Sequence, residues 1–237
     1  MSKLTGKKIL IVGGSSGIGA ATAKAFADLG ADVTIASRNM ERLGATAAEI
    51  NPSVEVGTID ITDDLSVQRF FDSDVTYDHV VVSGAQTPIG SLRELPMSDA
   101  YAAMESKFWG AYRVARYAKI SNDGSLTLVS GILSTRPSNG AAAQGAVNAA
   151  VEALARGLAL ELSPVRVNTV SPGIIATPLW SKLDDKSRES MYEATAARLP
   201  ARRMGQPADV ANAIVYVATT PYSTGSTVVV DGGHAIV

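Results

Sequence analysis

Seven residues near the start of the chain have the types and spacing of a phosphate-binding loop: Gly13-Gly14-Ser15-Ser16-Gly17-Ile18-Gly19. The loop joins an apolar run at 8–12, expected to be a strand, to a helical stretch at 20–29. Glycines allow a tight turn and a close approach to a ligand, and the first amides of a helix are unpaired donors. The pattern favours a pyrophosphate ligand. Its G-x-x-x-G-x-G spacing differs from the usual G-x-G-x-x-G, so an ordinary glycine turn is the alternative.

Two residues that follow the next strands could complete a dinucleotide site. A strand is expected at 32–36, and Ser37 and Arg38 stand at its end, where a dinucleotide fold meets the adenosine ribose. A guanidinium matches the geometry of a 2′-phosphate, so Arg38 favours NADP(H) over NAD(H), the alternative being a solvated arginine at a helix start. Asp60, after a strand at 54–59, either caps a local turn or accepts from the adenine amino group.

The rest of the chain alternates strand-like and helix-like runs. Further strands are expected at 78–82, 125–130, 165–170 and 226–230, and helices at 98–120, 141–162 and 207–218. This alternation predicts an α/β, Rossmann-like, doubly wound parallel sheet of about seven strands with helices on both faces and ligands at the carboxyl ends of the strands. His79 begins a strand at the opposite edge, so we expect no chemical role for it. The charge-rich stretch at about 179–203 is expected to form a helical lid over the substrate.

The composition limits the class of protein. The 237 residues fit a single domain, 1–237, and no linker or repeat divides them. A formal charge of −2 gives no basic face for nucleic acid or an anionic membrane, and a chain without cysteine forms no disulfide or reactive thiolate. The first residues lead directly into a strand and lack the apolar segment of a signal peptide, so a cytoplasmic location is expected. We expect no metal site.

These motifs, in this order, resemble those of the short-chain dehydrogenase/reductase family, and the resemblance covers essentially the whole chain. Besides the glycine loop it rests on three stretches: Asp60-Ile61, Ser171-Pro172-Gly173-Ile174-Ile175-Ala176-Thr177, and the ending Thr224-Gly225-Ser226 through Val230-Asp231-Gly232-Gly233. It implies an NADP(H)-dependent oxidoreductase that acts on a carbonyl, a hydroxyl or a related group of a small-molecule substrate. It also implies a homotetramer or homodimer built on the two long helices.

The resemblance assigns cofactor roles residue by residue. It implies phosphates at the glycine loop, the 2′-phosphate at Arg38, the adenine at Asp60 and the ribose along Gly84. It also implies that the nicotinamide is bordered by Pro172, Gly173, Ile175 and Thr177. The whole implied cofactor site consists of Gly13, Ser15, Ser16, Gly17, Ile18, Gly19, Ser37, Arg38, Asp60, Ile61, Ser83, Gly84, Ala85, Pro172, Gly173, Ile175 and Thr177.

The departures fall where the family places its proton chemistry. Its members use a tyrosine to transfer the proton, a lysine four residues on, a serine that orients the substrate and an asparagine that supports a water relay. A tyrosine with a pKa of about 10 needs a nearby cation to act as a base at neutral pH. Aligned on the family motifs, this chain has other residues at all four positions: Gln144 for the tyrosine, Asn148 for the lysine, Gly131 for the serine and Lys107 for the asparagine.

Two functions remain open. In the first, NADPH passes hydride to a carbonyl or another acceptor by a non-standard proton-transfer arrangement. Either Lys107 reaches into the vacated space and donates the proton, or solvent supplies it. The alternative for Lys107 is a side chain that extends to solvent or pairs with a carboxylate. In the second function, the chain is a catalytically inactive NADP(H)-binding protein, that is, a sensor, a scaffold or an inactive subunit. The polar loop residues Ser130, Ser134 and Arg136 are further candidates for hydrogen bonds to a ligand.

Overall fold

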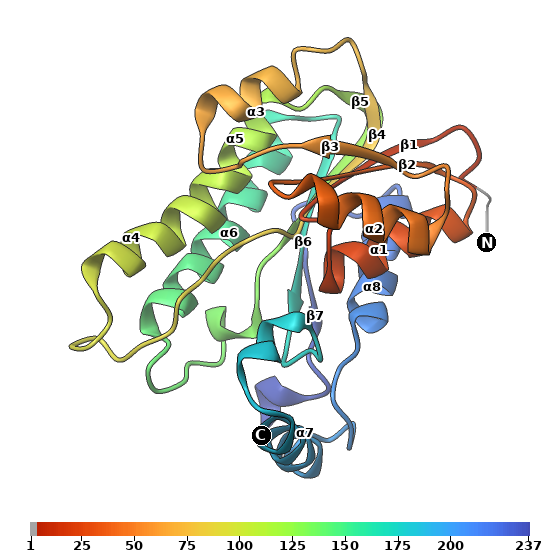
Figure 1. The fold of residues 1–237 in the computed structure, drawn as a ribbon. Coiled ribbons are helices and arrows are strands. Elements are labelled where there is room, and N and C mark those ends of the chain that lie inside the picture. Colours follow the sequence, from red (N-terminus) through yellow and green to blue (C-terminus); the bar gives the residue numbers. More distant parts are fainter. Residues whose placement is uncertain (1–3) are drawn as a thin grey trace.

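A parallel sheet between two layers of helices forms the molecule (Figure 1), in a computed structural model that describes residues 4–237. Seven strands lie in the order β3-β2-β1-β4-β5-β6-β7, and every neighbouring pair is parallel. Their bounds are β1 Lys8–Val12, β2 Asp32–Ser37, β3 Glu55–Thr58, β4 Tyr77–Val82, β5 Ile120–Val129, β6 Arg166–Pro172 and β7 Thr227–Val230. The predicted α/β fold with a doubly wound parallel sheet is confirmed.

The helices cover both faces of the sheet (Figure 1). One face carries α1 Gly17–Asp28, α2 Met40–Ile50 and α8 Pro207–Thr219, and the other carries α3 Asp64–Phe70, α4 Met97–Met104, α5 Gly110–Tyr117 and α6 Ala142–Glu161. Beyond the sheet edge lie the 3₁₀ segment η3 Pro178–Lys182 and α7 Asp185–Arg198. Within residues 4–237, no helix has both the length and the apolar character needed to cross a membrane.

The two hydrophobic cores follow from the alternation of side chains along each strand. Ile9 and Ile11 of β1 belong to the core beneath α1 and α8, whereas Leu10 and Val12 belong to the core beneath α5 and α6. All four side chains are buried, because a parallel sheet with helices on both faces exposes neither of them. This burial explains why the strands are continuous apolar runs in the sequence.

The helix expected at 98–120 differs from the prediction. The chain forms α4, then a π-helical segment, η1 Glu105–Trp109, then α5, which ends at Tyr117. Ile120 already belongs to β5, where it pairs with Tyr77 of β4. A π-helical turn adds a residue without interrupting the apolar pattern, so periodicity alone cannot show it, and such turns are frequent at functional sites.

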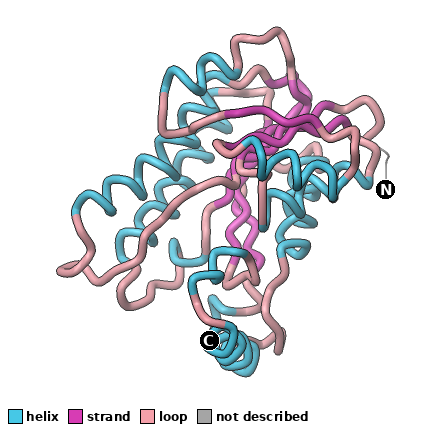
Figure 2. The backbone as a smooth tube through the Cα atoms, viewed as in Figure 1, coloured by secondary structure: helices cyan, strands magenta, loops and turns pink. Residues whose placement is uncertain are grey.

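The strand order reverses between β1 and β4, and this reversal positions the loops that follow them. The backbone amides of Ser83 and Gly84, just after β4, both donate to the Val12 carbonyl, at 2.9 and 3.2 Å. The loop that follows β4 leads to α4, and the chain that follows β6 leads to η3 and α7 (Figure 2). In open α/β sheets, ligands bind at such a switch point, outside the carboxyl ends of the strands.

His79 lies near the amino end of β4, as predicted, and it is buried. Its Nδ1 atom is 2.9 Å from the Ser125 hydroxyl, and its ring stacks on Phe26 with 6.3 Å between centroids. Burial, with a further contribution from the charge of Arg166, lowers the pKa of His79 to about 4. The imidazole is therefore neutral in the folded protein at neutral pH.

This buried imidazole predicts a stability that depends on pH. The unfolded chain binds the proton with a pKa near 6.5, so the stabilising contribution is complete above about pH 6.5 and is lost as the pH falls toward 4. We expect the free energy of unfolding to fall by up to about 3 kcal/mol over this window, and His79→Gln to flatten the decline. Urea denaturation at a series of pH values measures it. An identical decline in wild type and variant would assign the acid sensitivity to other groups.

Candidate functional site

A cavity of about 930 Å³ lies at the carboxyl ends of β1, β2 and β4, where the glycine loop was predicted to bind a ligand. Most residues of the predicted cofactor site line it: Gly13, Ser15, Ser16, Gly17, Ile18, Gly19, Ser37, Arg38, Asp60, Ile61, Ser83, Gly84, Ala85 and Thr177. The fold therefore brings together segments that are far apart in the sequence. The cavity is large enough for an extended small-molecule ligand.

The glycines of the loop are required for close packing. Gly13 has a φ of +87°, and a Cβ there would lie 2.2 Å from the Gly84 amide nitrogen. A Cβ on Gly19 would lie 2.1 Å from the Gly13 carbonyl oxygen. The loop thus presses the start of α1 against the ends of β1 and β4. Ser16, the N-cap residue, makes no side-chain capping bond, and the first intrahelical bond runs from Ala20 N to Ser16 O, so the preceding amides are donors suited to an anion.

Two arginines and a serine gather at the end of β2. Arg38 and Arg42 both line the cavity, and the Arg42 amide donates to Asn39 Oδ1 at 2.8 Å, which caps α2 and fixes the turn that carries Arg42. The hydroxyl of Ser37 is buried and has no protein partner. Sequence reasoning missed Arg42. The available signal was a second arginine four residues after Arg38, in the first turn of the helix.

Asp60 makes the local turn that was one of its two predicted roles. Its Oδ1 atom accepts from the Thr62 amide at 2.9 Å and from the Thr62 hydroxyl at 2.7 Å. Burial alone would raise the pKa of Asp60, but the bonds from Thr62 and the charges of Arg38 and Arg113 lower it below the usual value. The carboxylate therefore stays ionised at the cavity wall. The adenine contact remains a prediction.

The nicotinamide contacts predicted for three residues at the end of β6 and just after it remain a prediction. Pro172, Gly173 and Ile175 are not among the described residues that line the large cavity. β6 extends to Pro172, and the Gly173 amide donates to the Val230 carbonyl of β7 at 2.9 Å. Ile175 continues in a bridge to Gly205, and its carbonyl accepts from the Trp180 indole at 2.8 Å.

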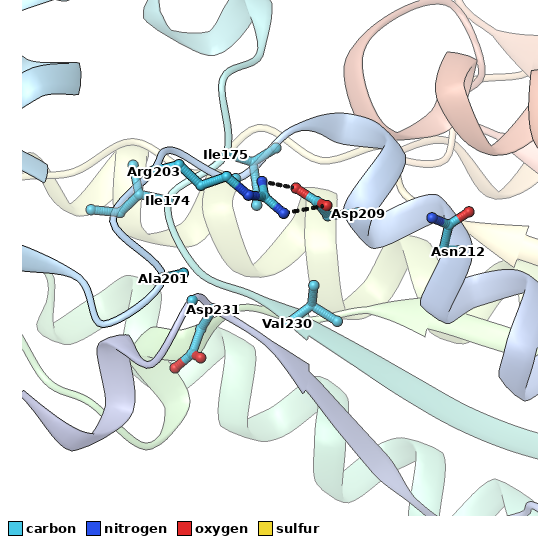
Figure 3. A pocket seen from close by; sticks show the side chains of 10 residues that line it. Ile174, Ile175, Ala201, Arg203, Asp209, Asn212, Val230 and Asp231 are labelled. Atoms are coloured by element: carbon cyan, nitrogen blue, oxygen red, sulfur yellow. Dashed lines mark hydrogen bonds and ion pairs between the residues drawn. The ribbon is translucent and has the colours of Figure 1, made fainter. Parts of the chain in front are cut away.

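A second, smaller cavity of about 210 Å³ is bordered by Ile175 (Figure 3). Arg203 and Asp209 point toward each other there and form two hydrogen bonds of 2.6 and 2.8 Å. The carboxylate of Asp231 accepts from the backbone amides of Gly233 and Ala235. The charged groups of this cavity are thus paired within the protein, and we assign no chemistry to it.

Lys107 belongs to the π-helical segment and points inward. Its ammonium donates to the Ser130 carbonyl and to Asn148 Oδ1, both at 2.6 Å. The residue is partly exposed, and the partners of its ammonium are neutral oxygens rather than a carboxylate. Burial lowers the pKa of Lys107 to about 8, while the charge of Glu152 opposes that shift. These two bonds use two of the three ammonium donors.

The other three positions aligned with the family's proton chemistry lie on α6 and in the loop after β5. Gln144 and Asn148 lie one turn apart on α6, and a Cβ on Gly131 would lie 2.7 Å from Asn148 Nδ2. Gln144 Nε2 donates at 3.1 Å to the hydroxyl of Thr87, which lines the cavity, and Gln144 Oε1 is buried without a partner. Asn148 thus joins Lys107 to the Gly131 position, and Gln144, one turn away, bonds to the cavity wall at Thr87; Lys107 itself is not among the residues that line the cavity.

The polar loop residues after β5 bond to the protein. The hydroxyls of Ser130 and Ser134 both donate to Glu152 Oε1, at 2.8 and 2.6 Å. Arg136 donates to the carbonyls of His234 and Val237. These three residues thus have partners within the protein, and a bond from any of them to a ligand stays a prediction. Sequence reasoning missed Glu152, although a carboxylate one turn after Asn148 on an alanine-rich helix was a visible signal.

Known proteins share both the sequence pattern and this fold. A family model described as enoyl-(acyl carrier protein) reductase matches residues 12–235. The chain belongs to the short-chain dehydrogenase/reductase family. Two relatives of this oxidoreductase family are the short-chain dehydrogenase/reductase ATR9 of Stachybotrys chlorohalonatus, 32% identical over 98% of both chains, and L-fucose dehydrogenase of Mus musculus, 32% identical over 98% of this chain and 90% of the relative. A small-chain dehydrogenase solved in complex with NADPH is 31% identical, with a TM-score of 0.84 over 98% of this chain and 100% of that one.

The contact between Gly131 and Asn148 predicts a packing constraint in this short-chain dehydrogenase/reductase. Gly131 has an extended backbone with φ of 167°, which any residue adopts, so Gly131→Ala should act only by displacing the Asn148 amide. We expect a destabilisation of about 1–3 kcal/mol, measured by urea denaturation. The cost should shrink in an Asn148→Ala background. Gly44→Ala is the control, because nothing lies within 4 Å of its Cβ position; equal effects at both glycines would refute the constraint.

Proposed function

We propose that the chain is an NADP(H)-dependent oxidoreductase that acts on a carbonyl or hydroxyl group of a small molecule, with Lys107 as the proton donor for reduction. The observation that carries this proposal is the inward ammonium of Lys107, held by two neutral oxygens and with a pKa of about 8. A group with such a pKa exchanges protons near neutral pH, as an acid catalyst must.

The residues of the large cavity fit the cofactor. The glycine loop and the first amides of α1 would hold the pyrophosphate, and Arg38 with Arg42 would hold a 2′-phosphate. The buried, unpartnered hydroxyl of Ser37 is a polar group that a ligand would satisfy. When bound, the cofactor supplies the hydride. The NADPH complex of a protein with the same fold supports this assignment.

The contacts of Lys107 explain how it would donate a proton. The Ser130 carbonyl and Asn148 Oδ1 fix the ammonium, so its remaining N–H can reach one direction only. The oxygen of a reduced carbonyl would take that proton, and solvent would restore it. General acid catalysis of this kind contributes typically about 10²–10⁴-fold to a rate.

Further proposals concern the surroundings of the site. We propose one domain in which the segment at about 179–203 acts as a lid, because Leu179 and Ser181 line the cavity while α7 lies beyond the sheet edge (Figure 1). The exposed aromatic side chains of Trp109 and Tyr112, which pack edge to face at 5.7 Å, support a homodimer or homotetramer formed through the long helices.

The preference for NADP(H) is tested at Arg38. We expect Arg38→Asp to weaken NADPH binding by about 10- to 100-fold and NADH binding far less, because a carboxylate repels the 2′-phosphate and can accept from a free 2′-hydroxyl. Fluorescence titration measures both affinities. Arg156→Asp, an exposed change on α6, is the charge-matched control. Equal weakening of both cofactors by Arg38→Asp would mean that the arginine is only structural.

The role of Lys107 is tested by the pH dependence of turnover. NADPH consumption is measured over a panel of aldehydes, ketones, quinones and imines, with Lys24→Met, a change of an exposed lysine, as the control. The reduction rate should fall as the pH rises through about 8, and Lys107→Met should lower it by about 10²–10⁴-fold and remove this dependence.

Two results would change this conclusion. Unchanged turnover in Lys107→Met would show that solvent or another group supplies the proton. Bound NADPH without turnover on any member of the panel would favour the catalytically inactive binding protein.

A further inference from the structure

Glu152 is a buried carboxylate with neutral partners. Only 8% of the residue is exposed, and its Oε1 atom accepts hydrogen bonds from the hydroxyls of Ser130 and Ser134. Burying a carboxylate is costly unless hydrogen bonds or an opposite charge compensate for the lost water. The two hydroxyls supply the hydrogen bonds, and a nearby positive charge would supply the rest of the compensation.

The same residues connect Glu152 to Lys107. Ser130 accepts from the Lys107 ammonium with its carbonyl and donates to Glu152 with its hydroxyl. Asn148, the second acceptor of the ammonium, lies one turn before Glu152 on α6. Of the two acceptors of Lys107, Ser130 therefore bonds directly to Glu152, and Asn148 lies one helical turn from it.

The other charged groups around the π-helical segment have their own partners or positions. Glu105 on that segment forms an ion pair with Arg113 of α5, and Arg113 also bonds to Asp64 of α3. Asp99 of α4 lines the large cavity. On α6, the charge that acts on Lys107 is that of Glu152, which opposes the effect of burial on the pKa of the lysine.

We propose that Glu152 is a positioning residue for Lys107: it balances the charge of the ammonium across Ser130 and Asn148, and it fixes the segment whose carbonyl holds that ammonium. This inference rests on the proposed function only for its consequence in catalysis. The carboxylate keeps the ammonium protonated at neutral pH in an otherwise desolvating site. Glu152 is not among the residues that line the large cavity, so we infer that it acts through Lys107.

The charge on Glu152 is tested by titrating Lys107 directly, without a substrate. Protein labelled with ¹³C and ¹⁵N in lysine is followed by NMR from neutral to alkaline pH, and Lys107→Met identifies the signal. Glu152→Gln keeps the shape and removes the charge, so the pKa of Lys107 should fall by about one unit, a tenfold change in its ionisation constant. Glu161→Gln, an exposed change at the end of the same helix, should leave that pKa in place.

The outcomes separate this inference from the proposed function. An unchanged Lys107 pKa in a folded Glu152→Gln protein would overturn the inference, whatever the turnover assay shows. If Glu152→Gln fails to fold, Glu152→Asp serves, because it retains the charge. The pKa of Lys107 in Glu152→Asp should stay near its value in the wild type. A fall of about one unit in this variant, the same as expected for loss of the charge, would refute the proposal. The proposed function fails on a different result, namely unchanged turnover in Lys107→Met.

Discussion

The need to satisfy the buried ammonium of Lys107 determines much of the structure around it. A cation removed from water is tolerated only with hydrogen bonds and an opposing charge. The Ser130 carbonyl and Asn148 Oδ1 supply the bonds, and Glu152 supplies the charge. Asn148 in turn occupies the space that a side chain at residue 131 would need, so the glycine there is a consequence of the same arrangement. Residues from η1, the loop after β5 and α6 are thus fixed by one interaction.

The cavity depends on a separate constraint, the reversal of strand order between β1 and β4. That reversal leaves room for Gly13 and Gly84 to meet closely and for the start of α1 to face the cavity. The bond between Gln144 and Thr87 joins the cavity wall to the Lys107 cluster. The architecture therefore places an anion-binding loop at the carboxyl ends of β1 and β4 and an ionisable group beside the carboxyl end of β5.

The sequence predicted the fold and most of the cavity wall, for physical reasons. Strands buried on both faces are continuous apolar runs, so β1 was placed at 8–12, and glycine loops and arginines at strand ends are visible in a single chain. The partners of Lys107 were not predictable, because Ser130 and Asn148 meet it only through tertiary packing and a π-helical turn that periodicity conceals. Pro172 and Ile175 were assigned to the nicotinamide by resemblance; the structure pairs them with β7 and Gly205, and their contact with the nicotinamide stays a prediction.

Proton release on cofactor binding tests whether the ammonium of Lys107 faces the nicotinamide end of the cavity. The nicotinamide ring is positive in NADP⁺ and neutral in NADPH, so only the oxidised form should lower the pKa of a neighbouring lysine. Calorimetry at a pH near that pKa, in buffers of different ionisation enthalpy, counts the protons released. The wild type should release more protons with NADP⁺ than with NADPH, and Lys107→Met should show no difference. Equal release for both cofactors in the wild type would contradict this account.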